Sequence, residues 1–128
     1  MGLLLITRIC LMSKKALQIQ FTIFALLAFA AMVYHIVGSI KPFDATPAWR
    51  HALFVAINII CIYGLLKRPV WFTWFWALLV VQQLYSHGSH FIRLLSQGKF
   101  AWIDFGVLVI TPVIFILLIV DKRSTRNS

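Results

Sequence analysis

Four histidines and one aspartate are the residues of this chain whose types and spacing could carry chemistry. His87 and His90 are three residues apart, which places both imidazoles on one face of a helix. Imidazole is the commonest metal ligand and a proton donor or acceptor near neutral pH, and a carboxylate can orient it. The set predicts either a metal or haem site with four candidate ligands, or a proton-transferring site with three candidate catalytic residues. The candidate ligands are His35, His51, His87 and His90, and the candidate catalytic residues are His87, His90 and Asp104.

Other polar side chains close to these residues in the sequence could bind a small ligand. Asp104 is the one acidic residue inside an apolar stretch, and an unpaired carboxylate in a membrane is costly. We therefore expect Asp104 to pair with Arg50, Arg93 or a histidine. The candidate ligand-binding residues are Arg50, Asn58, Gln83, Tyr85, Ser86 and Arg93.

Four apolar stretches must position these side chains. They run from about 16–40, 48–66, 70–90 and 101–120, and a membrane-spanning helix needs about 20 residues. Hydrophobic residues make up 62% of the chain and charged residues 12%, a composition that excludes an ordinary soluble domain. The sequence predicts an all-α, polytopic membrane protein, a four-transmembrane-helix up-down bundle. Residues 1–15 would be a cytoplasmic lead, 16–120 a single transmembrane domain, and 121–128 a cytoplasmic basic tail.

The third stretch gives the strongest reason to expect a polar site. Val70 to Val81 is free of strongly polar residues, but it forms only about 18 Å of helix against a hydrocarbon core about 30 Å thick. The turns from Gln82 to His90 must therefore complete the crossing. Their polar side chains should face the bundle interior or a water-filled cavity, because such groups are rare against lipid.

Basic residues are distributed unevenly between the two predicted sides of the membrane. The positive-inside bias therefore places both termini in the cytoplasm of a multi-pass cell-membrane protein, as in a bacterial inner membrane, and places the histidines and Asp104 near the extracytoplasmic face. The net charge of +9 does not indicate nucleic-acid binding, because the basic residues flank the spans. One side has Arg8, Lys14, Lys15, Lys67, Arg68, Lys122, Arg123 and Arg126, and the other has Lys41, Arg50, Arg93 and Lys99.

We expect a small integral membrane protein whose polar site binds a metal, haem or small ligand, with a redox or proton-transfer role. Two alternatives stay open: the polar residues hold the helices together, or the chain is a non-catalytic accessory or structural subunit of a membrane complex. The expected partners are the lipid bilayer and a second copy or a larger complex. In size, span number and topology the chain resembles the small bacterial four-helix membrane proteins of the DoxX-like type. A small DoxX-like membrane protein without a metal is therefore a further alternative, and no functional residue is carried over from that resemblance.

Overall fold

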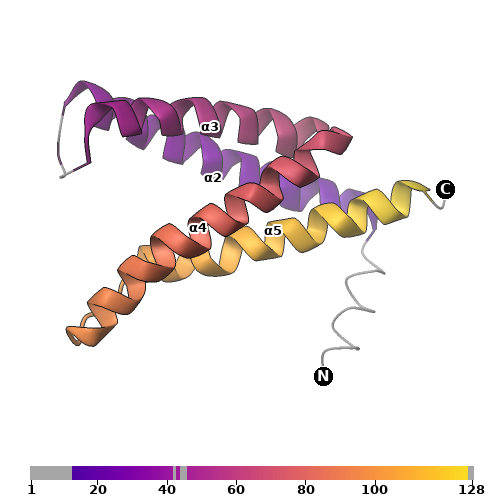
Figure 1. Ribbon diagram of the computed structural model, residues 1–128. Helices are drawn as coiled ribbons and strands as arrows, with labels where there is room; N and C mark the ends of the chain where they lie inside the picture. The colour runs from indigo at the N-terminus through magenta and orange to yellow at the C-terminus, as the bar shows by residue number, and fades with distance from the viewer. Residues whose placement is uncertain (1–12, 42, 44–45, 127–128) are drawn as a thin grey trace. The chain divides into compact units, whose positions relative to one another are not determined.

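The computed structural model describes residues 13–41, 43 and 46–126, and within them the chain forms four α-helices and no strand. These are α2 (Lys14–Ile40), α3 (Ala48–Lys67), α4 (Val70–Ser96) and α5 (Trp102–Arg126), labelled in Figure 1. The predicted cytoplasmic lead lies outside the described residues as far as Met12. Helix α2 already begins inside that predicted lead, at Lys14, because the Ser13 hydroxyl accepts a hydrogen bond from the Ala16 amide and caps the helix.

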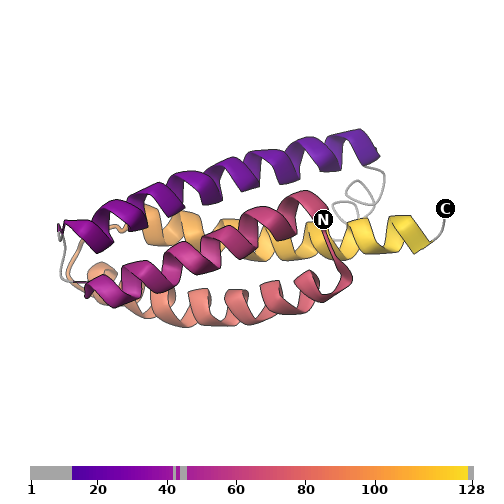
Figure 2. The same cartoon turned by 90° about the horizontal axis from the view of Figure 1, so that it is seen from above.

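Helices α2 and α3 form one compact hairpin, Ser13–Arg68. Figures 1 and 2 show the two helices side by side along their length. Phe21 on α2 and Leu65 on α3 are fully buried in its core. At the end of α3, the Arg68 guanidinium lies 5.0 Å from the centre of the Phe21 ring and donates a hydrogen bond to the Gln18 side chain. These contacts fasten the end of α3 to the first turns of α2.

Helices α4 and α5 form the second hairpin, which begins at Pro69. The buried Trp76 indole donates a hydrogen bond of 3.0 Å to the carbonyl of Thr111, the residue before the mid-helix Pro112. Helix α4 continues past the predicted span to Ser96, and Gly98 follows with φ +72°, a conformation that favours glycine. The glycine therefore marks the point where the chain leaves the helix.

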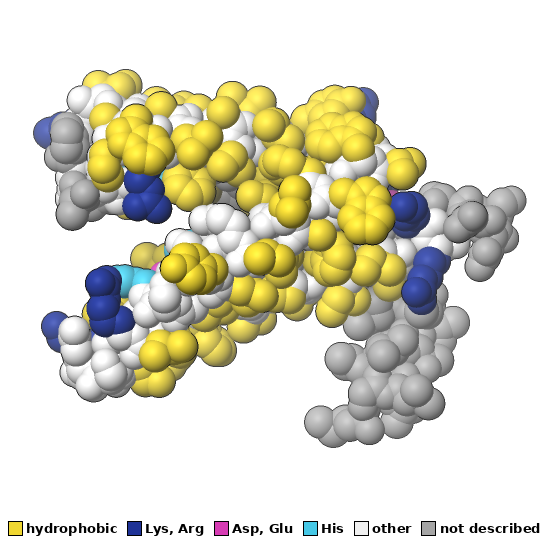
Figure 3. Space-filling model, in the orientation of Figure 1, with side chains coloured by type: hydrophobic (Ala, Val, Ile, Leu, Met, Phe, Trp, Pro, Cys, Tyr) yellow, Lys and Arg dark blue, Asp and Glu magenta, His cyan; other side chains and the backbone are white. Residues whose placement is uncertain are grey.

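Three of the described helices are long and apolar enough to cross a membrane: Lys14–Ile40, Ala48–Lys67 and Trp102–Arg123 of α5. Apolar side chains cover the visible face of the helices in Figure 3, and lysine and arginine side chains lie toward the helix ends. Such helices in a chain of 128 residues are the pattern of a membrane protein. Helix α4, with 27 residues, is long enough, but its polar second half keeps it out of this group. The all-helical architecture is thus as predicted. Helix α4, which corresponds to the third predicted span, is not among the candidate spans of the described residues.

Candidate functional site

The α4/α5 hairpin joins two histidines to one carboxylate near the loop between its helices. His87 Nδ1 lies 2.6 Å from Asp104 Oδ1, and His90 Nδ1 lies 2.7 Å from Asp104 Oδ2. Each carboxylate oxygen therefore has its own imidazole partner. The expectation that Asp104 pairs with a histidine is confirmed, and a single aspartate serves both rings.

The local sequence explains why these three side chains meet. His87 and His90 are separated by one helical turn in α4, so both face the same way. Asp104 lies in the first turn of α5, where a carboxylate is favoured by the positive end of the helix dipole. A Cβ at Gly88 would stand 3.8 Å from Leu108 of α5, which shows how closely the two helices approach there.

The shared carboxylate fixes the tautomer of both imidazoles. An ionised carboxylate only accepts hydrogen bonds, so each ring must donate its Nδ1–H. The Nε2 atom of each neutral ring is then left without a proton, as an acceptor or a ligand atom. The Asp104 side chain is only 10% exposed, whereas the side chains of His87 and His90 are 29% and 44% exposed. The carboxylate is thus covered, and the two rings remain open to a ligand.

The other two histidines form a different pair inside the α2/α3 hairpin. His35 Nδ1 and His51 Nδ1 are 3.0 Å apart, so one ring donates its Nδ1–H and the other accepts it. The rings of Tyr34, Phe43 and Phe54 surround the pair with centroid separations between 4.9 and 6.0 Å. His51 is fully buried. We call this the enclosed pair, because His51 is buried and aromatic rings pack against both imidazoles, although His35 itself is half-buried; the pair on α4 is the open pair.

Gly38 makes room for the enclosed pair. A Cβ at this position would lie 2.7 Å from His51 Cε1 and 2.8 Å from both ring nitrogens. Only glycine allows the His51 ring to lie against α2 in this way. Gly38 is absent from the sequence-based candidates, and its spacing of three residues from His35 is the signal that could have pointed to it.

The remaining predicted site residues are spread over the two hairpins. Asn58 donates to the carbonyl of Phe54 in its own helix. Arg93 is exposed on α4, and no ion pair joins it to Asp104 among the described residues. Gln83 has a buried Oε1 atom without a hydrogen-bond partner among the described groups, and Tyr85 is 81% exposed. Arg50 and Ser86 are placed on α3 and α4, exposed and half-buried respectively.

The predicted ligand set of four histidines is not assembled by either hairpin alone. The part of the chain that the structure describes contains no group of three or more histidine, cysteine, aspartate or glutamate side chains that could hold a metal ion. In the α4/α5 hairpin, both Nδ1 atoms are already directed at Asp104. In the α2/α3 hairpin, the two Nδ1 atoms face each other.

Comparison with protein families, with curated proteins and with solved structures finds no match to this chain.

Proposed function

We propose that this chain is a four-span integral membrane protein that accepts and releases protons through its Asp104-bridged histidine pair. The observation that carries the proposal is the shared carboxylate, which binds the Nδ1–H groups of His87 and His90 and leaves both Nε2 atoms as bases. A histidine oriented by an aspartate is a recurring proton-transfer device in catalysis. The site acts on a small ligand that gives a proton to one of these Nε2 atoms.

The contacts through which α4 packs against α5 support the proposal that α4 also crosses the membrane. The two helices are joined at Trp76–Thr111 and again at the Asp104 cluster, so α4 follows about two turns of a candidate span. Polar side chains are tolerated inside a membrane where they face a partner helix or water. The polar half of α4 directs His87 and His90 at α5, which lowers the cost of taking α4 across the bilayer.

Labelling of single cysteines distinguishes four spans from three. In a background with Cys10→Ser and Cys61→Ala, a four-span chain would expose Lys99→Cys to an impermeant maleimide outside the cell, and would keep Lys122→Cys inside. If α4 does not cross, these two positions exchange sides. Lys67→Cys is the matched control, because it lies on the cytoplasmic side in both arrangements. Outside labelling at position 67 would reverse the proposed orientation.

Imidazole ¹⁵N NMR in lipid bilayers tests the proton site. We expect His87 and His90 to have protonated Nδ1 and bare Nε2 in their neutral state. His87→Gln and His90→Gln assign the two signals. Nε2–H tautomers at both rings would contradict the proposal, because the Nδ1 atoms would then have no proton to donate to Asp104.

Metal binding is the competing use of a bare Nε2 atom, because metal-bound histidines also direct their other nitrogen at a carboxylate. The metal content of the purified protein decides between the two functions. Stoichiometric zinc, copper or iron that is lost in both His87→Ala and His90→Ala would replace proton transfer by metal binding. Metal-free protein in which both rings have the expected Nδ1–H tautomer would support proton transfer.

A further inference from the structure

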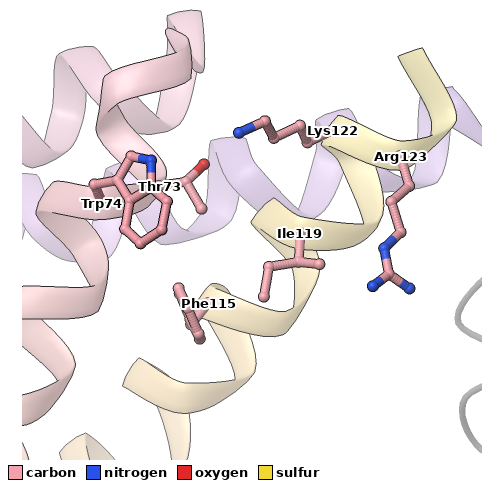
Figure 4. Close-up of a pocket in the computed structure, with 6 residues that line it drawn as sticks. All are labelled: Thr73, Trp74, Phe115, Ile119, Lys122 and Arg123. Atoms are coloured by element: carbon pink, nitrogen blue, oxygen red, sulfur yellow. The ribbon is translucent and has the colours of Figure 1, made fainter. Parts of the chain in front are cut away.

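The opposite end of the α4/α5 hairpin contains a cavity of about 290 Å³. It lies between the start of α4 and the end of α5, away from the Asp104 cluster, and Figure 4 shows its lining side chains. They are Thr73, Trp74, Phe115, Ile119, Lys122 and Arg123.

The lining changes from apolar to cationic along α5. Phe115, Ile119 and Arg123 are spaced by four residues and share one face of the helix. Lys122 extends from α5 toward α4 in Figure 4, and Thr73 adds a hydroxyl on the other wall. One ligand at this cavity would therefore meet hydrocarbon at one end and two positive charges at the other.

The cationic and apolar side chains of the cavity follow one another along α5 in the same order as the phosphate and the acyl chains of a lipid follow one another into a bilayer. The candidate span in α5 begins at Trp102, and about 20 residues cross the hydrocarbon core, so Lys122 and Arg123 lie at the membrane boundary. Ile119 and Phe115 lie one and two turns inside it. A phospholipid has the same order, with a phosphate at the boundary and acyl chains below.

We propose that this cavity binds an anionic glycerophospholipid. Its phosphate lies against Lys122 and Arg123, and the upper parts of its acyl chains lie against Trp74, Phe115 and Ile119. Basic pockets between membrane helices bind anionic headgroups in this way. The volume is at the lower limit of small-molecule sites, which start at about 300 Å³, so it takes the headgroup region and leaves the chain ends in the bilayer. A zwitterionic lipid is disfavoured because its ammonium group would lie beside two cations.

Native mass spectrometry of the full chain, titrated with phosphatidylglycerol and with phosphatidylcholine of identical acyl chains, tests this site. We expect preference for phosphatidylglycerol, and a loss of about fivefold in its affinity for Lys122→Gln and again for Arg123→Gln. Lys99→Gln removes the same charge at the other end of the hairpin and should leave the affinity unchanged. Equal binding of the two lipids, or an equal loss in Lys99→Gln, would overturn the proposal.

A cavity-filling variant shows whether lipid binding requires the apolar part of the cavity or only its two cationic side chains. Ile119→Trp retains both cations but occupies the apolar part, so we expect phosphatidylglycerol binding to fall while the thermal unfolding temperature stays near that of the parent chain. Unchanged binding by a folded Ile119→Trp protein would show that the cations attract lipid without the cavity, which contradicts the proposal. Competition by glycerol phosphate at the same concentration as the lipid would also contradict it, because the acyl chains would then contribute nothing.

Discussion

The two hairpins each carry a pair of histidines near the loop that joins their helices, but the pairs have different surroundings. In the α2/α3 hairpin, His35 and His51 bond to each other among aromatic rings. In the α4/α5 hairpin, both histidines bond to one covered carboxylate and keep open rings. A pair with a fully buried ring packed among aromatic side chains is suited to holding helices together. A pair that is oriented by a carboxylate and open to a ligand is suited to chemistry.

The largest difference between the pairs should appear in stability. His51→Ala removes a fully buried ring and leaves a cavity, so we expect a loss of about 2–4 kcal/mol in the free energy of unfolding. His90→Ala removes a partly exposed ring and one interhelical hydrogen bond, which averages about 0.6 kcal/mol in membranes. Unfolding in detergent mixtures with increasing dodecyl sulfate measures both. Equal losses would mean that the pair on α4 is structural as well.

The enclosed pair should also be sensitive to the backbone beside it. Gly38→Ala places a Cβ 2.7 Å from the His51 ring, and we expect overpacking to lower the free energy of unfolding by about 1–3 kcal/mol. Gly106→Ala on α5 is the control, because a Cβ there meets nothing within 4 Å. The same unfolding titration compares the two variants. If Gly38→Ala were as stable as Gly106→Ala, the His51 ring would not lie against α2.

Chemical modification should distinguish the two histidine pairs, because their rings differ in accessibility to a reagent. An unprotonated imidazole nitrogen attacks a carbonyl carbon of diethyl pyrocarbonate and becomes ethoxycarbonylated, and we expect this reaction at His87 and His90 in the folded protein. His51 should react only after unfolding, because its ring is enclosed. Peptide mass spectrometry of samples taken over time measures each rate. Reaction of His51 as fast as that of His90 would remove the distinction between an enclosed and an open pair.

Asp104→Asn should change the tautomers of the open pair with little effect on stability. An amide has one accepting oxygen and one donating nitrogen, so one imidazole can still donate its Nδ1–H while the other must accept at Nδ1. We expect the ¹⁵N spectrum to show one Nδ1–H ring and one Nε2–H ring, with His35 and His51 unchanged. Two unaltered Nδ1–H signals in this variant would contradict the bridging role of Asp104.

The smallest effect should come from Arg93. This side chain is exposed and makes no ion pair with Asp104 in the described structure, so Arg93→Gln should change the free energy of unfolding by no more than about 0.5 kcal/mol. The imidazole tautomers should also stay as they are. A shift of the His87 or His90 signal in this variant would show that Arg93 does interact with the Asp104 cluster.

The four helices could be predicted from the sequence because each depends on local features. Apolar length fixed the four stretches, Ser13 and Gly98 mark the ends of two helices, and the short apolar run of α4 indicated that its later turns need polar partners. The contact of Asp104 with both His87 and His90 could not be predicted from these local features. It depends on the register of α4 against α5, which spacing along one helix does not contain.

Side chains that bond within their own helix were the hardest to assign. Asn58 shares a face with His51 in the sequence pattern, but its amide donates to the Phe54 carbonyl. Local hydrogen bonds of this kind compete with contacts across helices. The expected convergence of all four histidines depends on how one hairpin is placed on the other, which no residue spacing encodes.

The close approach of Gly38 and His51 also has an evolutionary consequence. In a related chain, a side chain at the position of Gly38 would crowd an imidazole at the position of His51, so the two positions should change together. Gly106, with open space around its Cα, should vary independently of both. Paired substitution at positions 38 and 51 in divergent descendants would then trace this helix crossing through sequence change alone.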